Sequence, residues 1–162
     1  MRLLKHLFAP SASRLFPEPL LRRVAAAIAA SELRHSGEIC FAVEPALPAR
    51  AVWAGRQARA AAMDAFAHLR VWDTRANNGV LLYLLLADHR IEIVADRGFD
   101  GRVSAEQWRG VCQRVEDRLR AGDTEAAVLD GIEALSALLA EHYPRADGDQ
   151  DVNELPDLPR IL

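Results

Sequence analysis

The sequence predicts an α/β protein in which helices cover a small mixed β-sheet. Residues 80–87 are apolar at every position, which is typical of a central strand that is buried on both faces. Residues 38–44 form a second, mostly apolar run between Gly37 and Pro45. Between these runs, the Ala- and Arg-rich residues 48–70 repeat apolar side chains at helical spacing and predict one long crossover helix. Together the three segments predict a right-handed β-α-β unit with parallel strands.

One helix is expected before this unit, and a β-hairpin is expected at its end. Residues 19–35 repeat apolar side chains at helical spacing and are followed by Gly37, a candidate C-cap. Residues 91–95 form a third strand after a predicted two-residue turn at Asp88-His89. We therefore expect the third strand to run antiparallel to the second.

Two further helices complete the predicted order α-β-α-β-β-α-α. Ser104 and Gln107 form a capping box at the start of a strongly amphipathic helix, which Gly122 ends. Asp123 is placed to cap the last helix, which stops before Pro144.

The length of 162 residues suits one domain with one core. We divide the chain into an N-terminal arm at residues 1–17, an α/β domain at residues 18–144 and an acidic tail at residues 145–162. Pro156 and Pro159, with few core-forming residues around them, predict that the tail is an irregular strap or is partly disordered.

Charge and hydropathy narrow the classes of partner. The net charge of −3 resides in the tail, and the rest of the chain carries equal numbers of basic and acidic side chains. Nucleic acid is therefore not an expected partner. The longest apolar run is far shorter than the roughly 20 residues that a membrane-spanning helix needs. Residues 1–16 lack the continuous apolar core of a signal peptide, so we expect a cytoplasmic protein.

The two cysteines do not predict disulfide or phosphatase chemistry. Cys40 and Cys112 both fall in apolar patterns, which favours buried thiols. Cys112 and Arg118 have the C-x5-R spacing of a phosphotyrosine phosphatase, but both fall within one predicted helix, whereas that chemistry needs a loop. We find no motif for a nucleotide or another organic cofactor.

Several motifs in a fixed order carry a family resemblance. Asn78-Gly79 precedes the apolar strand, and Gly98-Phe99-Asp100-Gly101 follows the third strand. Arg120-Ala121-Gly122-Asp123 joins the last two helices, and Val128-Leu129-Asp130-Gly131-Ile132 lies in the last one. This succession resembles the TPM domain family, from the first strand through the last helix.

The resemblance implies a compact α/β sandwich, divalent cations in the acidic loops of some members, and weak acid phosphatase activity in at least one. Many relatives carry a signal peptide and a membrane tether, which we do not expect here. Where relatives often have Asp-Asn-Gly before the apolar strand, this chain has Asn77-Asn78-Gly79, so one charge is missing from the expected cation loop.

The predicted topology gathers oxygen-bearing side chains at one end of the sheet. A two-residue hairpin turn would place Asn77 opposite Asp100 and Leu81 opposite Asp96, and the first strand would begin at the same end. Carboxylate and amide oxygens are the ligands that Ca²⁺ and Mg²⁺ take. The alternative is that these residues are turn formers and solvated strand ends. The candidate ligands are Glu38, Asp73, Asn77, Asn78, Asp96 and Asp100.

An anion site is a second expectation for the same loops. Arg75, Arg97 and Ser104 lie near the start of a predicted helix, where backbone N–H groups attract a phosphate. Alternatively, the two arginines form surface ion pairs with the neighbouring acids.

The N-terminal arm combines apolar and basic residues. Leu3, Leu4, Leu7 and Phe8 alternate with Arg2, Lys5 and His6, a pattern that suits weak contact of residues 1–16 with a membrane surface or with a protein partner. Packing of the arm on the domain's own surface is the simpler interpretation.

Three functions remain open from the sequence. The leading hypothesis is a binding or regulatory module whose acidic loops are ordered by a divalent cation. The alternative is a metal-assisted acid phosphatase in which Asp73 or Asp100 holds the cation and Arg97 holds the phosphate. A third reading is an assembly or repair factor that docks through its arm.

Overall fold

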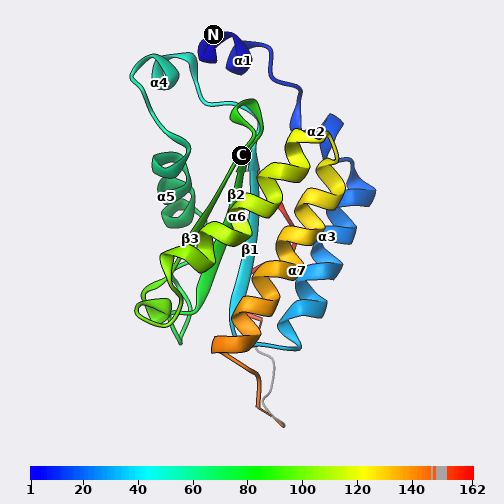
Figure 1. The fold of residues 1–162 in the computed structure, drawn as a ribbon, viewed down its shortest axis with the longest axis vertical. Coiled ribbons are helices and arrows are strands. Elements are labelled where there is room, and N and C mark those ends of the chain that lie inside the picture. Colours follow the sequence, from blue (N-terminus) through cyan, green and yellow to red (C-terminus); the bar gives the residue numbers. More distant parts are fainter. Residues whose placement is uncertain (147, 149–152) are drawn as a thin grey trace.

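A mixed β-sheet of four strands in the described residues runs through the molecule, in the spatial order β3-β2-β1-β4 (Figure 1). The structure, a computed structural model, describes residues 1–146, 148 and 153–162. β1 is parallel to β2 and β4, and β3 is antiparallel to β2, which confirms the predicted fold class. The elements are α1 (Arg2–Leu7), α2 (Ala12–Leu15), α3 (Glu18–Glu32), β1 (Glu38–Glu44), α4 (Ala49–Trp53), α5 (Ala58–His68), β2 (Gly79–Leu85), η1 (Leu86–Asp88), β3 (Arg90–Ala95), η2 (Arg97–Phe99), α6 (Ala105–Arg120), α7 (Thr124–His142) and β4 (Arg160–Ile161).

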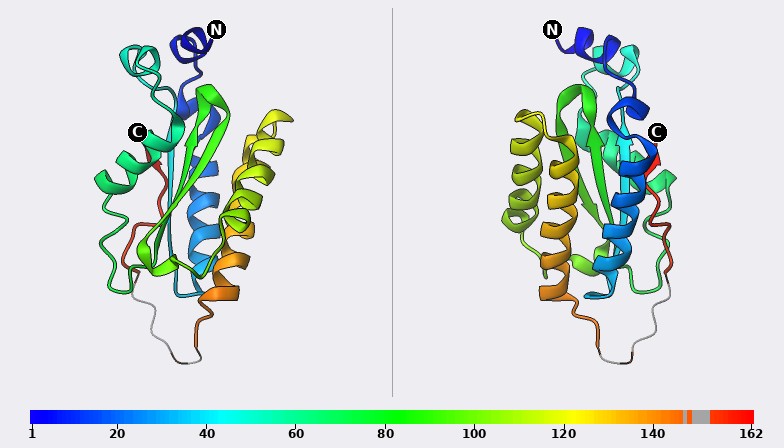
Figure 2. Two further views of the ribbon diagram at one scale, coloured as in Figure 1. Left: turned by 60° about the vertical axis from the view of Figure 1, so that its left-hand side comes forward. Right: turned by 90° about the vertical axis from the view of Figure 1, so that its right-hand side faces the viewer.

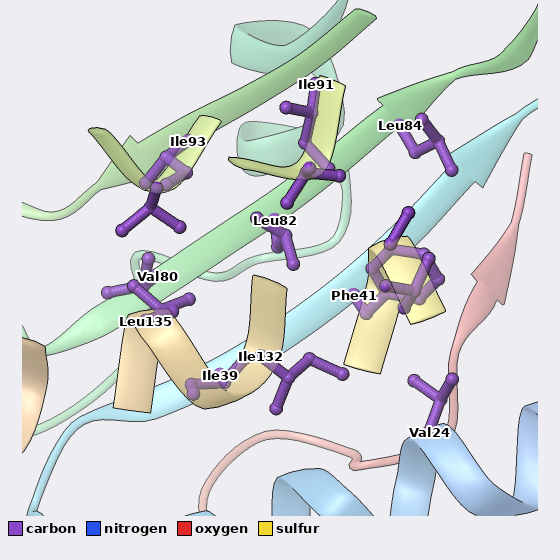
Figure 3. Close-up of a cluster of buried hydrophobic side chains, with 14 of the residues drawn as sticks. Val24, Ile39, Phe41, Val80, Leu82, Leu84, Ile91, Ile93, Ile132 and Leu135 are labelled. Atoms are coloured by element: carbon purple, nitrogen blue, oxygen red, sulfur yellow. The ribbon is translucent and has the colours of Figure 1, made fainter. Parts of the chain in front are cut away.

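Helices cover the two faces of the sheet as separate layers (Figure 2). On one face, Phe41 and Leu82 pack in a core with side chains of α3, α6 and α7 (Figure 3). On the other face, Ala42 and Tyr83 pack with α5. Successive residues of a strand point to opposite faces, so a strand that is apolar at every position supplies both cores.

The hairpin between β2 and β3 differs from the prediction. Leu85 pairs with Arg90, so the connection has four residues, of which η1 supplies three and His89 adopts a left-handed conformation with φ of 48°. The predicted two-residue turn and its register were wrong: Leu81 lies opposite Val94. Residues 86 and 87 are apolar because they are buried in the turn. A buried turn residue and a buried strand residue look alike in the sequence, so the strand was predicted to be too long.

The predicted crossover helix at residues 48–70 is two helices, α4 and α5. The residues between them include Gly55, whose φ of +76° favours glycine. The helical spacing of the apolar residues correctly predicted helix in this segment. It did not predict the break near Gly55, where the backbone is left-handed.

The two helix caps that the sequence predicted are confirmed. Ser104 Oγ accepts a hydrogen bond from Gln107 N at 3.2 Å, and the Gln107 side chain accepts one from Ser104 N at 2.9 Å. At the start of α7, Asp123 Oδ1 accepts a hydrogen bond from Ala126 N at 3.1 Å. Side chains close to one another in sequence satisfy the first N–H groups of each helix, so no tertiary information was needed.

Both chain ends pack on the domain. The arm forms α1 and α2, and α1 contacts α4 and η1. In the tail, Leu155 is buried in the same core as α5, and β4 pairs with β1, with Val43 beside Ile161. The expected strap therefore ends in a short strand that the sequence did not predict, while its acidic residues Asp147, Asp149 and Asp151 lie outside the described residues. No described helix is both long enough and apolar enough to cross a bilayer.

Two helical glycines provide a matched test of the packing between α6 and α7. A Cβ on Gly131 would lie 2.6 Å from Val115 Cγ2, whereas a Cβ on exposed Gly110 would meet no atom within 4 Å. We expect Gly131→Ala to lower the free energy of unfolding by about 1–3 kcal/mol through overpacking. Gly110→Ala should raise it by about 0.5–1 kcal/mol, because alanine loses less backbone entropy in a helix. Urea denaturation of both variants checks the pair, and equal effects would contradict the close packing.

Candidate functional site

Three loops lie side by side at the end of the sheet where β1 and β2 begin. Glu38 N donates to Asn78 O at 3.0 Å, which joins the entries of β1 and β2. Asp96 N donates to Gly79 O, and Gly98 N donates to Asn77 O, both at 2.9 Å, which joins the exit of β3 to the entry of β2. We call residues 73–79 and 96–101, together with Glu38, the loop cluster. The sequence placed these segments at the same end of the sheet.

Glycines permit this close approach. A Cβ on Gly79 would collide with the backbone oxygen of Val71, and a Cβ on Gly98 would collide with the backbone oxygen of Asn77. Both glycines belong to the motifs that carried the family resemblance. Their presence is therefore explained by backbone packing, without a role in ligand binding.

The acids of the loop cluster mostly have partners within the protein. Glu38 is buried, and its Oε2 accepts from the backbone N–H groups of Glu154 and Leu155 at 3.2 and 3.3 Å. Asp73 is exposed and forms an ion pair with Arg70. Asp100 is exposed at the end of η2. Glu38 thus holds the C-terminal strap in place, a role that no local pattern predicts.

Asp96 differs from the other acids, because one of its oxygens has no partner. Its Oδ1 accepts from Arg97 N at 2.7 Å and caps η2. Its Oδ2 is buried and makes no hydrogen bond with any described residue. A buried carboxylate oxygen that lacks a hydrogen bond is costly, so this atom marks a place where a ligand would be stabilised.

The two asparagines have separate surroundings. Asn77 Oδ1 accepts from Arg97 Nε at 2.9 Å, and the φ of Asn77 is 52°. Asn78 is buried and its Nδ2 donates to Ser36 O, while its Oδ1 has no partner among the described residues. Asp96 N donates to Gly79 O, so Asp96 lies level with Gly79, the residue after Asn78. The two unpartnered oxygens belong to neighbouring segments of the loop cluster.

The expected anion ligands each have contacts of their own. Arg97 contacts Asn77, Ser104 Oγ is used in the cap of α6, and the backbone N–H of Arg75 donates to Glu154 Oε2 at 3.1 Å. Among the residues that the structure describes, no three His, Cys, Asp or Glu side chains are placed to hold a metal ion together.

His35 is a buried titratable residue that sequence reasoning did not single out. It is fully buried between α3 and β1, and neither ring nitrogen has a hydrogen-bond partner among the described residues. Burial lowers the pKa of His35 to about 4; a backbone contact with Gly37 opposes this shift, and the charges of Arg34 and Arg145 add to it. At neutral pH the ring is uncharged and cannot act as an acid. In the sequence, His35 is only the last residue of a predicted helix that Gly37 follows. That pattern gave no sign that the imidazole is buried.

The prediction of buried thiols is confirmed for Cys40, whereas Cys112 is only partly buried. Burial raises the pKa of the Cys40 thiol and that of Cys112 to about 11, so both remain protonated at neutral pH. Neither forms a disulfide. Cys112 and Arg118 lie within α6, and Arg118 Nε pairs with Asp130 Oδ2 at 2.7 Å, so they do not form a phosphate-binding loop.

Comparison with known proteins identifies similar chains. The family described as the TPM domain matches residues 14–138, a range that includes the whole loop cluster. The NMR structure of the BA42 protein from the psychrophilic bacterium Bizionia argentinensis has a similar fold, with a TM-score of 0.76 and 26% sequence identity. That match covers 88% of this chain and 92% of the other. No curated protein matches.

The buried His35 predicts a specific pH dependence of stability. Its pKa is about 4 in the folded chain against an ordinary value of 6.5, so the unfolded chain takes up the proton first as the pH falls. The free energy of unfolding should fall between pH 6.5 and 4, by up to about 1.4 kcal/mol per pH unit. Denaturation across this window should show a loss about 2–3 kcal/mol larger for the wild type than for His35→Gln.

The exposed His68 supplies the control. His68→Gln should retain the pH dependence of the wild type. Parallel curves for the wild type and His35→Gln would mean that burial of His35 does not govern the acid response.

Proposed function

The chain belongs to the TPM domain family, as the order of its motifs predicted, and we propose that it is a binding module whose loop cluster takes a divalent cation at Asp96. The observation that supports this proposal is the buried, unpartnered Oδ2 of Asp96. Carboxylate oxygens are suitable ligands for Ca²⁺ and Mg²⁺, and a cation would stabilise an oxygen that otherwise lacks a partner.

The charge of the available ligands predicts a weak site. Glu38 and Asp73 already interact with other groups of the protein. The carboxylates that remain for a cation are those of Asp96 and of exposed Asp100 in the same loop. Water would supply the remaining ligands. Since the affinity of Ca²⁺ sites falls with fewer charged ligands, we expect a dissociation constant of about 10⁻⁴–10⁻³ M.

Arg97 is the expected competitor of the cation. Its guanidinium contacts Asn77 across the loop cluster, and its own backbone N–H is capped by Asp96. Its positive charge therefore lies in the same loop cluster as the proposed ion. Replacement of this arginine by a neutral residue should remove repulsion and strengthen cation binding.

A metal-assisted phosphatase is supported less well by the same loops. The residues assigned to phosphate and cation in that hypothesis have other contacts: Arg97 with Asn77, Asp73 with Arg70, and Ser104 with the first turn of α6. A hydrolase would have to break these contacts before binding substrate. Binding without catalysis requires only that Asp96 accept the ion.

Calorimetric titration with Ca²⁺ and Mg²⁺ tests the cation site. The informative variant is Asp96→Asn, because asparagine keeps an oxygen that can cap Arg97 N while it removes the charge. We expect the wild type to bind with a dissociation constant of about 10⁻⁴–10⁻³ M. Asp96→Asn should abolish the heat of binding, and Arg97→Gln should increase the affinity.

Asp73→Asn is the matched control, since Asp73 is also a loop aspartate but pairs with Arg70 at the surface. It should bind the cation as the wild type does. Equal binding by the wild type and Asp96→Asn, or no binding by a folded wild type at ten millimolar metal, about ten times the weaker constant, would overturn the proposal. Metal-dependent hydrolysis of p-nitrophenyl phosphate that is lost in Asp96→Asn would instead favour the phosphatase.

A further inference from the structure

Helix α1 reverses the usual placement of polar and apolar side chains. Its buried residue is His6, whereas Leu4 and Leu7 are exposed at 57% and 58%. Phe8, directly after the helix, is exposed at 81%. A surface helix normally turns its apolar face towards the core. Here the apolar side faces away from the domain, and no described residue covers it.

Polar contacts fix α1 in this orientation. Arg2 Nη2 donates to Asp88 Oδ2 at 2.7 Å. Leu47 N donates to His6 Nδ1 at 3.0 Å, so in the neutral ring the proton lies on Nε2, which is 3.1 Å from Asp88 Oδ1. Burial alone would raise the pKa of Asp88, but the hydrogen bonds from Arg2 and His6 and the charge of Arg2 lower it below its usual value. The ionised Asp88 therefore holds α1 on the domain with its leucines outward.

Helix α4 brings a further exposed apolar residue to the same end of the molecule. It contacts α1, and the two helices lie at the same end of the molecule (Figure 1). Trp53, the last residue of α4, is exposed at 88% and Met1 is fully exposed. We call Met1, Leu4, Leu7, Phe8 and Trp53 the apolar tip.

Basic residues predominate in the segments that carry the apolar tip, while Glu44 and Asp64 lie beside Arg50. Residues 1–17 and 45–63, which form α1, α2, α4 and the start of α5, contain six arginines and lysines and no Asp or Glu. Of these, Lys5 and Arg50 are exposed and form no ion pair with a described residue. Asp88, the acid that contacts α1, forms an ion pair with Arg2.

We propose that the apolar tip inserts into the surface of a membrane rich in anionic lipid, with Lys5 and Arg50 at the level of the headgroups. Tryptophan, phenylalanine and leucine beside basic residues form the pattern of proteins that lie on a bilayer. Each basic residue near an anionic surface adds to the attraction.

The shape of the tip favours a bilayer over a protein as its partner. Met1, Phe8 and Trp53 are each more than four-fifths exposed, so they project from the surface. A protein partner would need a matching pocket for every projecting side chain, whereas lipid chains rearrange around them. The loop cluster lies at the opposite end, where β1 and β2 begin, and stays open to solvent when the tip is inserted (Figures 1 and 2).

Vesicle flotation of the full chain tests this proposal. One set of vesicles contains phosphatidylcholine, and the other contains equal parts of phosphatidylcholine and phosphatidylglycerol. We expect the wild type to float with the anionic vesicles at least about tenfold more than with the neutral ones, and to dissociate at 1 M salt. The double variants Phe8→Ala/Trp53→Ala and Lys5→Glu/Arg50→Glu should each reduce binding at least about tenfold.

Trp72→Ala is the matched control, because Trp72 is an exposed tryptophan that directly precedes the loop cluster in sequence and is not part of the apolar tip. It should bind vesicles as the wild type does, and circular dichroism should show every variant folded. Three results would overturn the proposal: no binding to anionic vesicles, equal binding to both vesicle types, or normal binding by the double variants. A dimer of the wild type that Phe8→Ala/Trp53→Ala dissociates would assign the tip to a second copy of the chain instead.

Discussion

Strand β2 has to be covered on both faces, since all seven of its residues are buried. Val80, Leu82 and Leu84 enter the core under α3, α6 and α7, while Leu81 and Leu85 enter the core under α5. Burial of each large apolar side chain contributes about 1.5–3 kcal/mol, so removing either helical layer would expose half of this strand at a cost comparable to the whole stability of a domain. The crossover through α4 and α5 and the return through α6 and α7 both follow from this requirement.

The same burial decides how polar groups near the strands are satisfied. Tyr83 lies in the second core, and its hydroxyl donates to Glu44; burial and this hydrogen bond raise the pKa of Tyr83. At the other end of β1, Glu38 accepts from the backbone of the strap. His35 has no such partner and remains neutral because it is buried. Glu44 and Glu38 therefore form hydrogen bonds within the protein, whereas Asn78 and Asp96 each keep one buried oxygen without a partner among the described residues.

The two ends of the molecule offer different chemistry. The loop cluster is polar, and its charges are mostly paired, as Asp73 with Arg70 illustrates. The opposite end is apolar and basic, and its orientation depends on Asp88, which comes from the turn of the hairpin. A module that binds a membrane at one end and an ion at the other would have the length of the sheet between its two sites.

The sequence by itself determined the elements whose signal is local. The apolar run of β2 predicted a central strand, and the pair Ser104 and Gln107 predicted the start of α6, because neighbours in sequence make these interactions. It failed where one residue changes the backbone: Gly55 divides the crossover helix, and His89 lengthens the hairpin turn. The shift of register moved Asp96 from its expected place opposite Leu81.

For the candidate site, the sequence placed the three loops at one end of the sheet, because strand direction fixes where chain ends meet. Only the tertiary structure decided what each side chain contacts. Arg97 reaches Asn77 across the loop cluster, and Glu38 binds the backbone at Leu155, far away in sequence. The leucines of α1 were likewise evident in the sequence as part of an amphipathic pattern. That they face outward depends on the contact between Arg2 and Asp88, which lie 86 residues apart. Local periodicity specifies which face of an element is apolar, whereas distant contacts specify where that face points.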